Sequence, residues 1–391
     1  LAEVDVLLGA VERIDGGAIA GWACMRRPDG SERPAILEVR ADDVLVFRFV
    51  ASAVREDVRA RGACGIDRTG FRLDHAFPAG TKIALNSAET GALLGEAPRF
   101  VAPPLSPRIG LIAPARDEAP FLMEWLAYHR TRGIERFFIA DNGGADATSD
   151  LLRRLDRAGV VTRYDYLGRS HFQTDFYAET VARPEVRESC DLLAALDCDE
   201  FLVATSGRPI PATLAELFAD AAVSAVALNW ANYGTAGREE HDPGRLVIEQ
   251  YDRRAVESNP LNTHIKSVFR PERFRGFRVN VHAIDMDYGL YRAASGAEAD
   301  WDRTRAARGI TRVPDWTNLR VNHYSTKSRS AFVQRKLRGS AADGAATEAF
   351  RRHADYFALH DTNDVQEPVV PAVIAETRAE IARLEALIAK A

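Results

Sequence analysis

Two aspartates stand directly after a short apolar run in the middle of the chain. The run covers residues 192–196, and Asp197, Cys198, Asp199 and Glu200 follow it. A continuous apolar run is typical of a strand buried in a parallel sheet, and such sheets bind ligands beyond the carboxyl ends of their strands. Two carboxylates there could share a hard divalent cation such as Mg²⁺ or Mn²⁺. An acidic turn after a strand would look the same, so the motif alone leaves both interpretations open.

Acidic residues also follow two earlier apolar runs, residues 109–114 and residues 136–140. The acids concerned are Asp117, Glu118, Asp141 and Asp146. The carboxyl ends of parallel strands meet at one edge of a sheet, so these side chains could together bind ribose hydroxyls, a base edge and a metal. Their repetition at successive strand ends favours a binding site over chance solvation.

Helices are predicted between these strands, at residues 120–132, 148–158 and about 174–181, with a further strand at 160–164. Alternating strands and helices of this length predict an α/β unit with a mostly parallel sheet and right-handed crossovers. The chain has no G-x-G-x-x-G after a strand and no G-x-x-x-x-G-K-[ST]. A dinucleotide-dependent dehydrogenase and a P-loop enzyme are therefore disfavoured.

The pattern before residue 103 is different, with short apolar stretches separated by turn residues. It predicts a small all-β, sandwich-like accessory domain over residues 1–102. Four prolines between residues 98 and 107 predict a semi-rigid linker, placed at 103–108. The α/β catalytic domain is then expected at 109–345, and a helical extension at 346–391.

The last helix is predicted over residues 372–391, with another over 347–359. In the last helix Ile374, Ile381, Leu384 and Ile388 fall on one face. That face could dock on the catalytic domain or pair with a second copy of the chain to form an oligomer. Docking is favoured, because the heptads are too few for a stable coiled coil.

The composition is that of an ordinary globular protein, with 46% hydrophobic and 27% charged residues in a chain of 391. A formal charge of −5 argues against a general nucleic-acid binder. No apolar run approaches the ~20 residues of a membrane span, and no signal peptide is visible. The four cysteines lack C-x-x-C spacing, so we expect neither a zinc site nor a disulfide framework. Reduced thiols favour a cytoplasmic location, with attachment to the inner face of a membrane as the alternative.

A series of ordered motifs between about residues 108 and 340 resembles GT-A type glycosyltransferases, and more closely the family 2-like enzymes related to family 92. The motifs are Arg116-Asp117-Glu118, Glu124-Trp125-Leu126-Ala127-Tyr128-His129, Asp141-Asn142-Gly143, Gln173, Asp197-Cys198-Asp199-Glu200-Phe201, Trp230-Ala231-Asn232-Tyr233-Gly234-Thr235-Ala236-Gly237, Lys266-Ser267-Val268-Phe269-Arg270-Pro271, Asn322-His323-Tyr324-Ser325-Thr326-Lys327-Ser328 and Lys336-Leu337-Arg338-Gly339. In the first domain, the stretch Gly17-Ala18-Ile19-Ala20-Gly21-Trp22-Ala23, followed by Arg55-Glu56-Asp57-Val58 and Gly70-Phe71, resembles a β-domain often appended to bacterial glycosyltransferases.

The resemblance implies transfer of a sugar from a nucleotide-diphosphate donor, most simply a UDP-sugar, to a glycan or other hydroxyl acceptor. It implies an inverting reaction, a role in bacterial cell-surface polysaccharide synthesis, and Mn²⁺ or Mg²⁺ between the diphosphate and the Asp-x-Asp motif. Asp199 is the expected metal ligand, and Asp197 would contact the metal through water or the ribose. The third ligand is expected at His323, with His282 as the alternative. Either histidine taken alone would more often be a half-buried structural residue than a metal ligand.

Further roles follow from the same resemblance. The expected donor-binding residues are Arg116, Glu118, Asp141, Asp146, Asp197, Lys327, Lys336 and Arg338, of which the last three would hold the diphosphate. A carboxylate must deprotonate the acceptor hydroxyl, and Glu239 or Glu240 is the candidate base. An exposed acidic turn is the competing interpretation for that pair. Trp230 could stack on an acceptor sugar or belong to the core.

Two other classes of protein remain open at this point. A non-catalytic glycan-binding protein could retain a degenerate transferase fold, although the presence of both Asp residues, the His-Tyr motif and the Lys-x-x-Gly segment disfavours it. A nucleotidyltransferase on a similar sheet is more distant, because the first loop has no Gly-rich, basic character.

Overall fold

The computed structural model describes residues 4–14, 18–75, 77, 81–95, 97–100, 106–338 and 353–391. The chain divides into two compact units, one of Leu1–Leu105 with Phe218–Ala222 and one of Ser106–Leu217 with Val223–Ala391. Each unit is described by itself. Residues 103–105 of the predicted linker at 103–108 lie outside the described residues.

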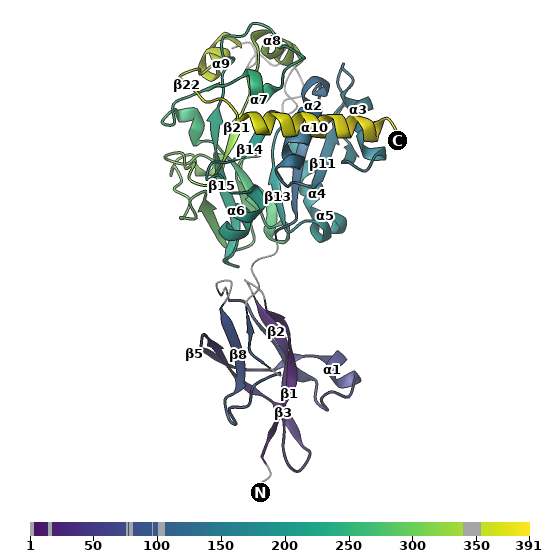
Figure 1. Ribbon diagram of the computed structural model, residues 1–391, viewed down its shortest axis with the longest axis vertical. Coiled ribbons are helices and arrows are strands. Elements are labelled where there is room, and N and C mark those ends of the chain that lie inside the picture. The colour runs from purple at the N-terminus through teal and green to yellow at the C-terminus, as the bar shows by residue number, and fades with distance from the viewer. Residues whose placement is uncertain are drawn as a thin grey trace. The chain divides into compact units, whose positions relative to one another are not determined.

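The first unit contains two antiparallel sheets and one short helix (Figure 1). One sheet has the order β1-β2-β7-β6, with β3 paired to β2, and the other has the order β5-β4-β8-β9. Their bounds are β1 Val6–Ile14, β2 Ile19–Arg26, β3 Glu32–Pro34, β4 Ile36–Ala41, β5 Val44–Val50, β6 Ala53–Val54, α1 Glu56–Ala60, β7 Arg68–Leu73, β8 Lys82–Ser87 and β9 Arg99–Phe100. Buried Ile19, Leu37 and Leu85 from both sheets share one core, as alternation of apolar residues along strands requires.

The expectation of reduced cysteines is wrong for one pair. Cys24 of β2 and Cys64, which follows α1, form a disulfide with their Cα atoms 6.9 Å apart. The two residues are 40 positions apart, so no local spacing motif could reveal the pairing. Cys190 and Cys198 are free and buried. The disulfide removes the cysteine argument for a cytoplasmic location.

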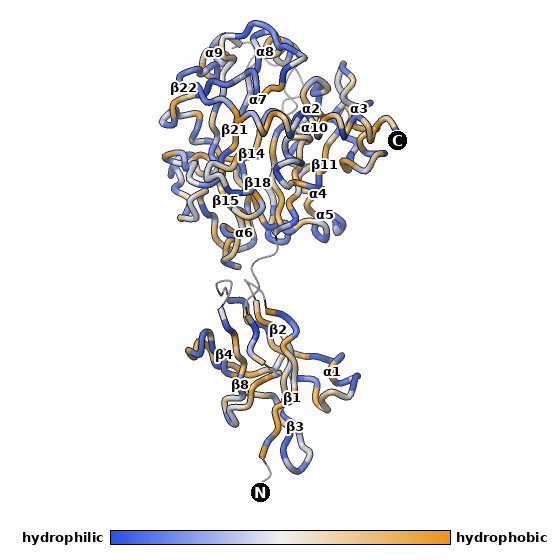
Figure 2. The backbone as a smooth tube through the Cα atoms, in the orientation of Figure 1, coloured by the Kyte–Doolittle hydropathy of each residue, from blue (hydrophilic) through white to orange (hydrophobic). Residues whose placement is uncertain are grey.

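The second unit is built on a nine-stranded mixed sheet with the order β12-β11-β10-β13-β17-β15-β21-β14, and β20 pairs with β15 off this path. The strands are β10 Ile109–Ala115, β11 Arg136–Asp141, β12 Thr162–Asp165, β13 Leu192–Ala195, β14 Glu200–Ala204, β15 Val223–Asn232, β17 Ile265–Phe269, β20 Leu290–Ala293 and β21 Leu319–His323. Strands β10 to β13 pair in parallel, whereas β17 is antiparallel to both of its neighbours. Much of this sheet is apolar, as the orange segments in Figure 2 show.

Helices and small two-stranded sheets lie around this sheet (Figure 1). The helices are α2 Ala119–Thr131, α3 Thr148–Arg157, α4 Gln173–Ala182, α5 Pro184–Ser189, α6 Ile210–Leu217, α7 Val247–Gln250, α8 Arg329–Arg338, α9 His353–His360 and α10 Pro371–Ile388. Single-turn helices lie at Pro260–Thr263, Pro271–Arg273 and Ala306–Arg308. β18 Phe274–Phe277 and β19 Ile284–Met286 form a small hairpin, and β16 Arg253–Arg254 pairs with the distant strand β22 Val365–Gln366 in a separate two-stranded sheet. The predicted α/β alternation is thus present from β10 to β13.

The last helix docks on its own unit. In Figure 1 α10, drawn in yellow, crosses α2, and the two helices are in contact. Arg130 of α2 donates to Glu380 at 2.6 Å, while Leu384 and Ile388 are buried. These contacts agree with docking and occupy the face that a coiled coil would need. The start of the helix predicted at 347–359 lies outside the described residues, and α9 covers its end.

Within the described residues, no helix is both long enough and apolar enough to cross a membrane.

Candidate functional site

The Asp-x-Asp motif lies in the connection between β13 and β14, at the carboxyl end of a buried parallel strand. Asp199 is 2% exposed, and its carbonyl oxygen accepts a hydrogen bond from the Tyr324 N–H. Glu200 opens β14 and lies opposite His323 of β21. This pairing brings His323 Nε2 to 3.9 Å from Asp199 Oδ1. The expected Asp199–His323 pair is therefore assembled across two strands that are distant in sequence.

Asp197 is held by residues from two other elements. Lys266 of β17 places its Nζ 2.9 Å from Asp197 Oδ2 and 3.1 Å from Glu200 Oε2. Gln173 at the start of α4 donates to Asp197 Oδ1 at 3.1 Å. Both oxygens of Asp197 thus already have protein partners, so Asp199 is the better placed of the two aspartates to bind a metal directly.

Lys266 is the main residue of the site to which sequence reasoning assigned no role. It is 0% exposed, and its position in the apolar segment Ile265–Phe269 was the signal available in the sequence. Burial acts to lower the pKa of Lys266, but the charges of Asp197 and Glu200 outweigh it and raise that pKa. Burial raises the pKa of Glu200 to about 8, although Lys266 acts in the opposite direction. A protonated Lys266 therefore neutralises part of the carboxylate charge at this strand end.

Trp230 of β15 lies between two histidine rings. Strand β15 runs between β17 and β21, so His264 and His323 approach the indole from opposite sides. The ring centroids are 5.0 Å apart for His264 and 4.1 Å for His323, with interplanar angles of 19° and 34°. His282 meets the indole edge at 5.1 Å. Because both faces of Trp230 are covered and the residue is 7% exposed, it belongs to the core and does not offer a sugar-stacking face.

The two candidate histidines differ in their contacts. His282 Nδ1 hydrogen-bonds with the Ile265 carbonyl oxygen at 2.9 Å. Burial lowers the pKa of His282 well below its ordinary value, with the positive charge of Lys266 adding to the effect. Within residues 106–338, His282 makes no described contact with Asp197 or Asp199. The geometry therefore favours His323 over His282 as the partner of Asp199.

The donor set at Asp199 suits a hard or borderline divalent cation. An oxygen and an imidazole nitrogen 3.9 Å apart can both bind one ion at distances of ~2.1 Å. In the described part of the chain, Asp197, Asp199 and His323 do not bring three ligand atoms within 4.8 Å of one another; the three residues that do are Cys24, Glu32 and Cys64. The candidate metal site is therefore described by two protein ligands, Asp199 and His323. Two protein ligands leave positions open for phosphate oxygens and water, which is how Mg²⁺ is commonly held.

The first strand ends in a loop that is braced by its neighbour. Asp117 has a positive φ of 54°, and its Oδ1 accepts from the Ala145 N–H at 2.6 Å. Gly144 passes so close that an added Cβ would lie 2.5 Å from Asp117 Oδ1. Asp146 accepts from the Ala119 N–H at 3.0 Å, which ties this loop to the start of α2. These contacts hold Arg116 and Glu118 at the edge of the sheet. Asp146 thus stabilises the loop, in addition to any role in binding the donor.

Asp141 is fully buried at the end of β11. Its carboxylate accepts from Arg163 Nε at 2.7 Å, from Ser149 Oγ at 2.7 Å and from the Gly143 N–H at 3.0 Å. Because the side chain is fully buried behind these donors, a ribose hydroxyl could reach it only after the surrounding loop moved. The expected donor-binding role of Asp141 therefore competes with its role in holding the loop between β11 and α3.

The three cations expected at the diphosphate are placed differently. Lys327 is 4% exposed, has a positive φ of 49°, and its Nζ lies 4.4 Å from the centroid of the Phe121 ring. It belongs to the segment that continues β21 from His323. Lys336 and Arg338 lie in α8, but their side chains are outside the described part of the structure.

The candidate bases lie on an exposed loop that packs against the start of α8. Glu240 accepts from Ser330 Oγ at 2.6 Å, and Glu239 lies 3.9 Å from Arg329 Nε with 78% of its side chain exposed. Among the described residues, no contact joins either glutamate to Asp197 or Asp199. The structure therefore gives these two residues the environment of an exposed acidic turn, and the base role stays a prediction.

The comparisons with known proteins first identify a class. The family model described as Glycosyltransferase family 92 matches residues 112–292, a region that contains the Asp-x-Asp motif, Trp230 and Lys266. The resemblance to family 92 glycosyltransferases is therefore confirmed.

Individual relatives are distant and longer. A glycosyltransferase family 92 protein of Oryza sativa subsp. japonica is 28% identical over 177 residues, which cover 45% of this chain and 29% of that protein. One from Arabidopsis thaliana is 28% identical over 184 residues, covering 44% and 31%. The chain thus spans about 30% of the length of these relatives. The crystal structure of S. aureus TarS 1-349 in complex with UDP is 10% identical with a TM-score of 0.28, covering 42% of this chain and 47% of that one.

Proposed function

We propose that this chain is a metal-dependent glycosyltransferase that moves a sugar from a nucleotide-diphosphate donor to a glycan or other hydroxyl acceptor. The observation that carries the proposal is the Asp199–His323 pair, which lies beside the carboxylate and lysine cluster at the end of β13. The match of residues 112–292 to family 92 supports the same reaction class.

The leaving group of such a transfer is a nucleoside diphosphate, whose developing negative charge must be neutralised. Asp199 and His323 would hold Mn²⁺ or Mg²⁺, and the bound ion would supply that neutralisation. Lys266 keeps Asp197 oriented through its 2.9 Å contact, and Gln173 fixes the other oxygen of the same carboxylate. Asp197 would then meet the donor with a fixed geometry, which lowers the cost of ordering it in the transition state.

The cations around the site would contact the diphosphate. Lys327 is the best placed of them among the described side chains, because it follows His323 by four positions and is buried near the same strand ends. Arg116 and Glu118, at the end of β10, lie on the adjoining edge of the sheet and would contact the nucleotide. A UDP-sugar is the donor that we propose to test first.

The stereochemistry and the biological setting are further parts of the proposal. We propose an inverting displacement, in which Glu239 or Glu240 would remove the acceptor proton after the exposed loop that carries them moves toward the bound sugar. A role in bacterial cell-surface polysaccharide synthesis stays a prediction, and the two curated relatives named above are plant proteins.

The test is donor turnover in the presence of Mn²⁺ with a panel of nucleotide-diphosphate sugars. Asp199→Asn should reduce metal-dependent turnover by at least about a hundredfold, because it removes a negative metal ligand while preserving size. Asp287→Asn is the matched control, since Asp287 is half-exposed and pairs with Arg275 at the surface. Equal turnover by the Asp199→Asn variant and the wild-type chain would refute the proposed mechanism.

The competing function is glycan binding without chemistry. It predicts sugar binding with no donor turnover for any nucleotide sugar, whether or not Mn²⁺ is present. The buried Lys266, which balances the charge of Asp197, favours the transferase, because a merely structural strand end would not need a costly buried charge.

A further inference from the structure

A polar pocket of about 520 Å³ lies on the second unit, beside β15 but outside the Asp199 cluster. Asn229 of β15 lines this pocket, whereas its neighbour Trp230 packs in the histidine cluster. Successive residues of a strand point to opposite faces, so the pocket and the cluster share one strand but open on different faces. The Trp316 indole N–H donates to the Trp230 carbonyl oxygen at 3.0 Å, which further couples the pocket wall to that strand.

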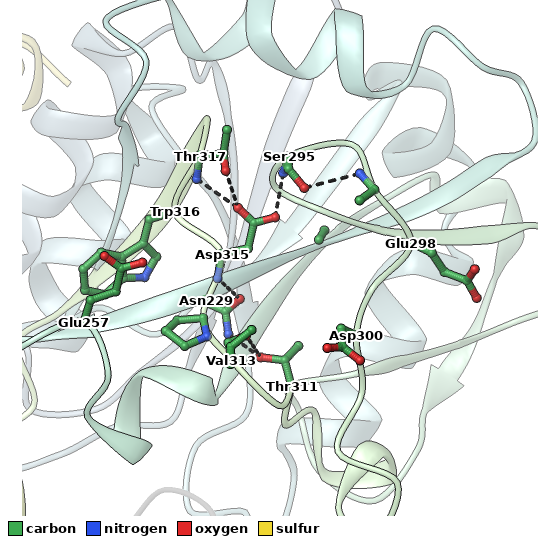
Figure 3. A pocket seen from close by; sticks show the side chains of 13 residues that line it. Asn229, Glu257, Ser295, Glu298, Asp300, Thr311, Val313, Asp315, Trp316 and Thr317 are labelled. Atoms are coloured by element: carbon green, nitrogen blue, oxygen red, sulfur yellow. Dashed lines mark hydrogen bonds between the residues drawn. The ribbon is translucent and has the colours of Figure 1, made fainter.

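The inner wall of the pocket is organised by its own hydrogen bonds, drawn as dashed lines in Figure 3. Asn229 Nδ2 donates to Thr311 Oγ1 at 2.8 Å, and Asn229 Oδ1 accepts from the Asp315 N–H at 3.0 Å. The Asp315 carboxylate in turn accepts from the N–H groups of Ser295 and Thr317 at 2.9 and 3.0 Å. This wall is therefore pre-formed and does not have to be ordered by a ligand.

The outer wall carries carboxylates with acceptor capacity to spare. Among the interactions of the described residues, none involves the side-chain oxygens of Glu257 or Glu298, which are both exposed. Asp300 uses only Oδ1, which accepts from Arg312 Nε at 2.8 Å. In Figure 3 Glu298 and Asp300 lie across the pocket from Trp316 and Glu257. The acceptors are thus spread along the pocket and do not converge on one point.

The lining defines the chemistry of the ligand. It contains four carboxylates and an indole ring, and no lysine, arginine or histidine belongs to it. An anionic ligand such as a nucleoside diphosphate would be repelled, so the pocket is not a second donor site. A sugar donates hydroxyl protons to carboxylates, and its C–H groups can pack against the part of the Trp316 indole that Arg254 and Arg320, which lie 5.0 and 4.9 Å from the ring centroid, leave uncovered. The spread of the acceptors favours such an extended ligand over a single metal ion.

We propose that this pocket is a glycan subsite that takes a sugar residue free of acidic groups, either a neutral sugar or an amino sugar. Its role as a remote subsite for the acceptor rests on the transferase function proposed above. In that role the pocket binds a sugar residue of the acceptor that is remote from the reacting hydroxyl. The shared strand β15 sets the distance between this pocket and the Asp199 cluster.

The binding test uses the whole chain on an immobilised array of neutral, amino and acidic oligosaccharides. We expect binding to neutral or amino sugars and not to acidic ones. The double substitution Glu257→Gln and Glu298→Gln should weaken that binding by at least about tenfold, since hydrogen bonds to charged acceptors are the stronger ones. Glu272→Gln, an exposed carboxylate outside the pocket, is the control and should bind like the wild type. All substituted residues are exposed, so the variants should fold, which circular dichroism checks.

Three results would overturn the inference. They are an absence of binding to every neutral and amino sugar, equal binding by the double variant, and preferential binding of acidic sugars. The acceptor role has its own readout, since the double variant should raise the acceptor KM and leave the donor KM unchanged. Array binding by a wild-type chain that turns over no nucleotide-sugar donor would mean that the proposed function fails while the subsite stands.

Discussion

Lys266 offers the sharpest test of how the candidate site is held together. The side chain is fully buried, and its Nζ lies 2.9 Å from Asp197 Oδ2 and 3.1 Å from Glu200 Oε2. Lys266→Met keeps the length and apolar stem of the side chain but removes the charge. Glu200 is also fully buried, and its pKa of about 8 makes it largely protonated at neutral pH, so the substitution chiefly leaves the Asp197 carboxylate without its cation.

Breaking a buried ion pair by removing one partner costs about 3–5 kcal/mol of folding free energy. The cost for Lys266→Met should lie at the lower end of this range, because Asp197, the carboxylate that carries the charge at neutral pH, keeps 31% of its side chain exposed. Arg275→Met is the matched control. It removes a cation from a pair of similar length with Asp287, but both partners are well exposed, and such pairs contribute no more than about 1 kcal/mol.

The assay is urea unfolding followed by tryptophan fluorescence at neutral pH without added metal. Of the five tryptophans only Trp22 precedes residue 106, so the signal reports mainly on the second unit. Linear extrapolation gives the free energy of unfolding for each variant. A loss below about 1 kcal/mol for Lys266→Met, or an equal loss for Arg275→Met, would refute the view that Lys266 neutralises a buried carboxylate cluster.

Two further predictions concern stability. Burial lowers the pKa of His129 to about 3, and the Leu202 N–H donates to its Nε2, so the ring is neutral in the folded state. The unfolded chain therefore binds more protons below pH ~6.5, and this group should cost about 2 kcal/mol of stability between pH 7 and pH 5. In urea titrations, the free energy of unfolding of His129→Gln should fall by about 2 kcal/mol less than that of the wild type over the same pH interval. Equal falls for the two chains would contradict the neutral state assigned to His129. Reduction of the Cys24–Cys64 disulfide opens a 40-residue loop and should destabilise the first unit by about 3–4 kcal/mol, which would appear as unfolding at a lower urea concentration when dithiothreitol is present. The control is the Cys24→Ser and Cys64→Ser double variant, whose unfolding should not respond to dithiothreitol. An unfolding transition of the wild-type chain that dithiothreitol leaves unchanged would count against the bond.

The amino-acid sequence determined the local elements of the second unit and the place of its chemistry. The apolar runs predicted at 109–114 and 136–140 are β10 and β11, because a strand buried on both faces must be apolar throughout. The intervening helix was readable from its own periodicity, which depends only on residues three or four positions apart. The Asp-x-Asp motif was recognised for a similar reason, since both carboxylates belong to one short segment.

The tertiary structure alone decided which distant side chains meet. Lys266 reaches Asp197 because β17 lies beside β13, and Trp230 is covered on both faces because β15 lies between β17 and β21. His323 lies near Asp199 because the register of β14 and β21 pairs it with Glu200. Register and strand order depend on the packing of the whole sheet, so no local pattern of residues encodes them. The same reason explains why the Cys24–Cys64 bond and the pocket beside Asn229 were not predicted from the sequence.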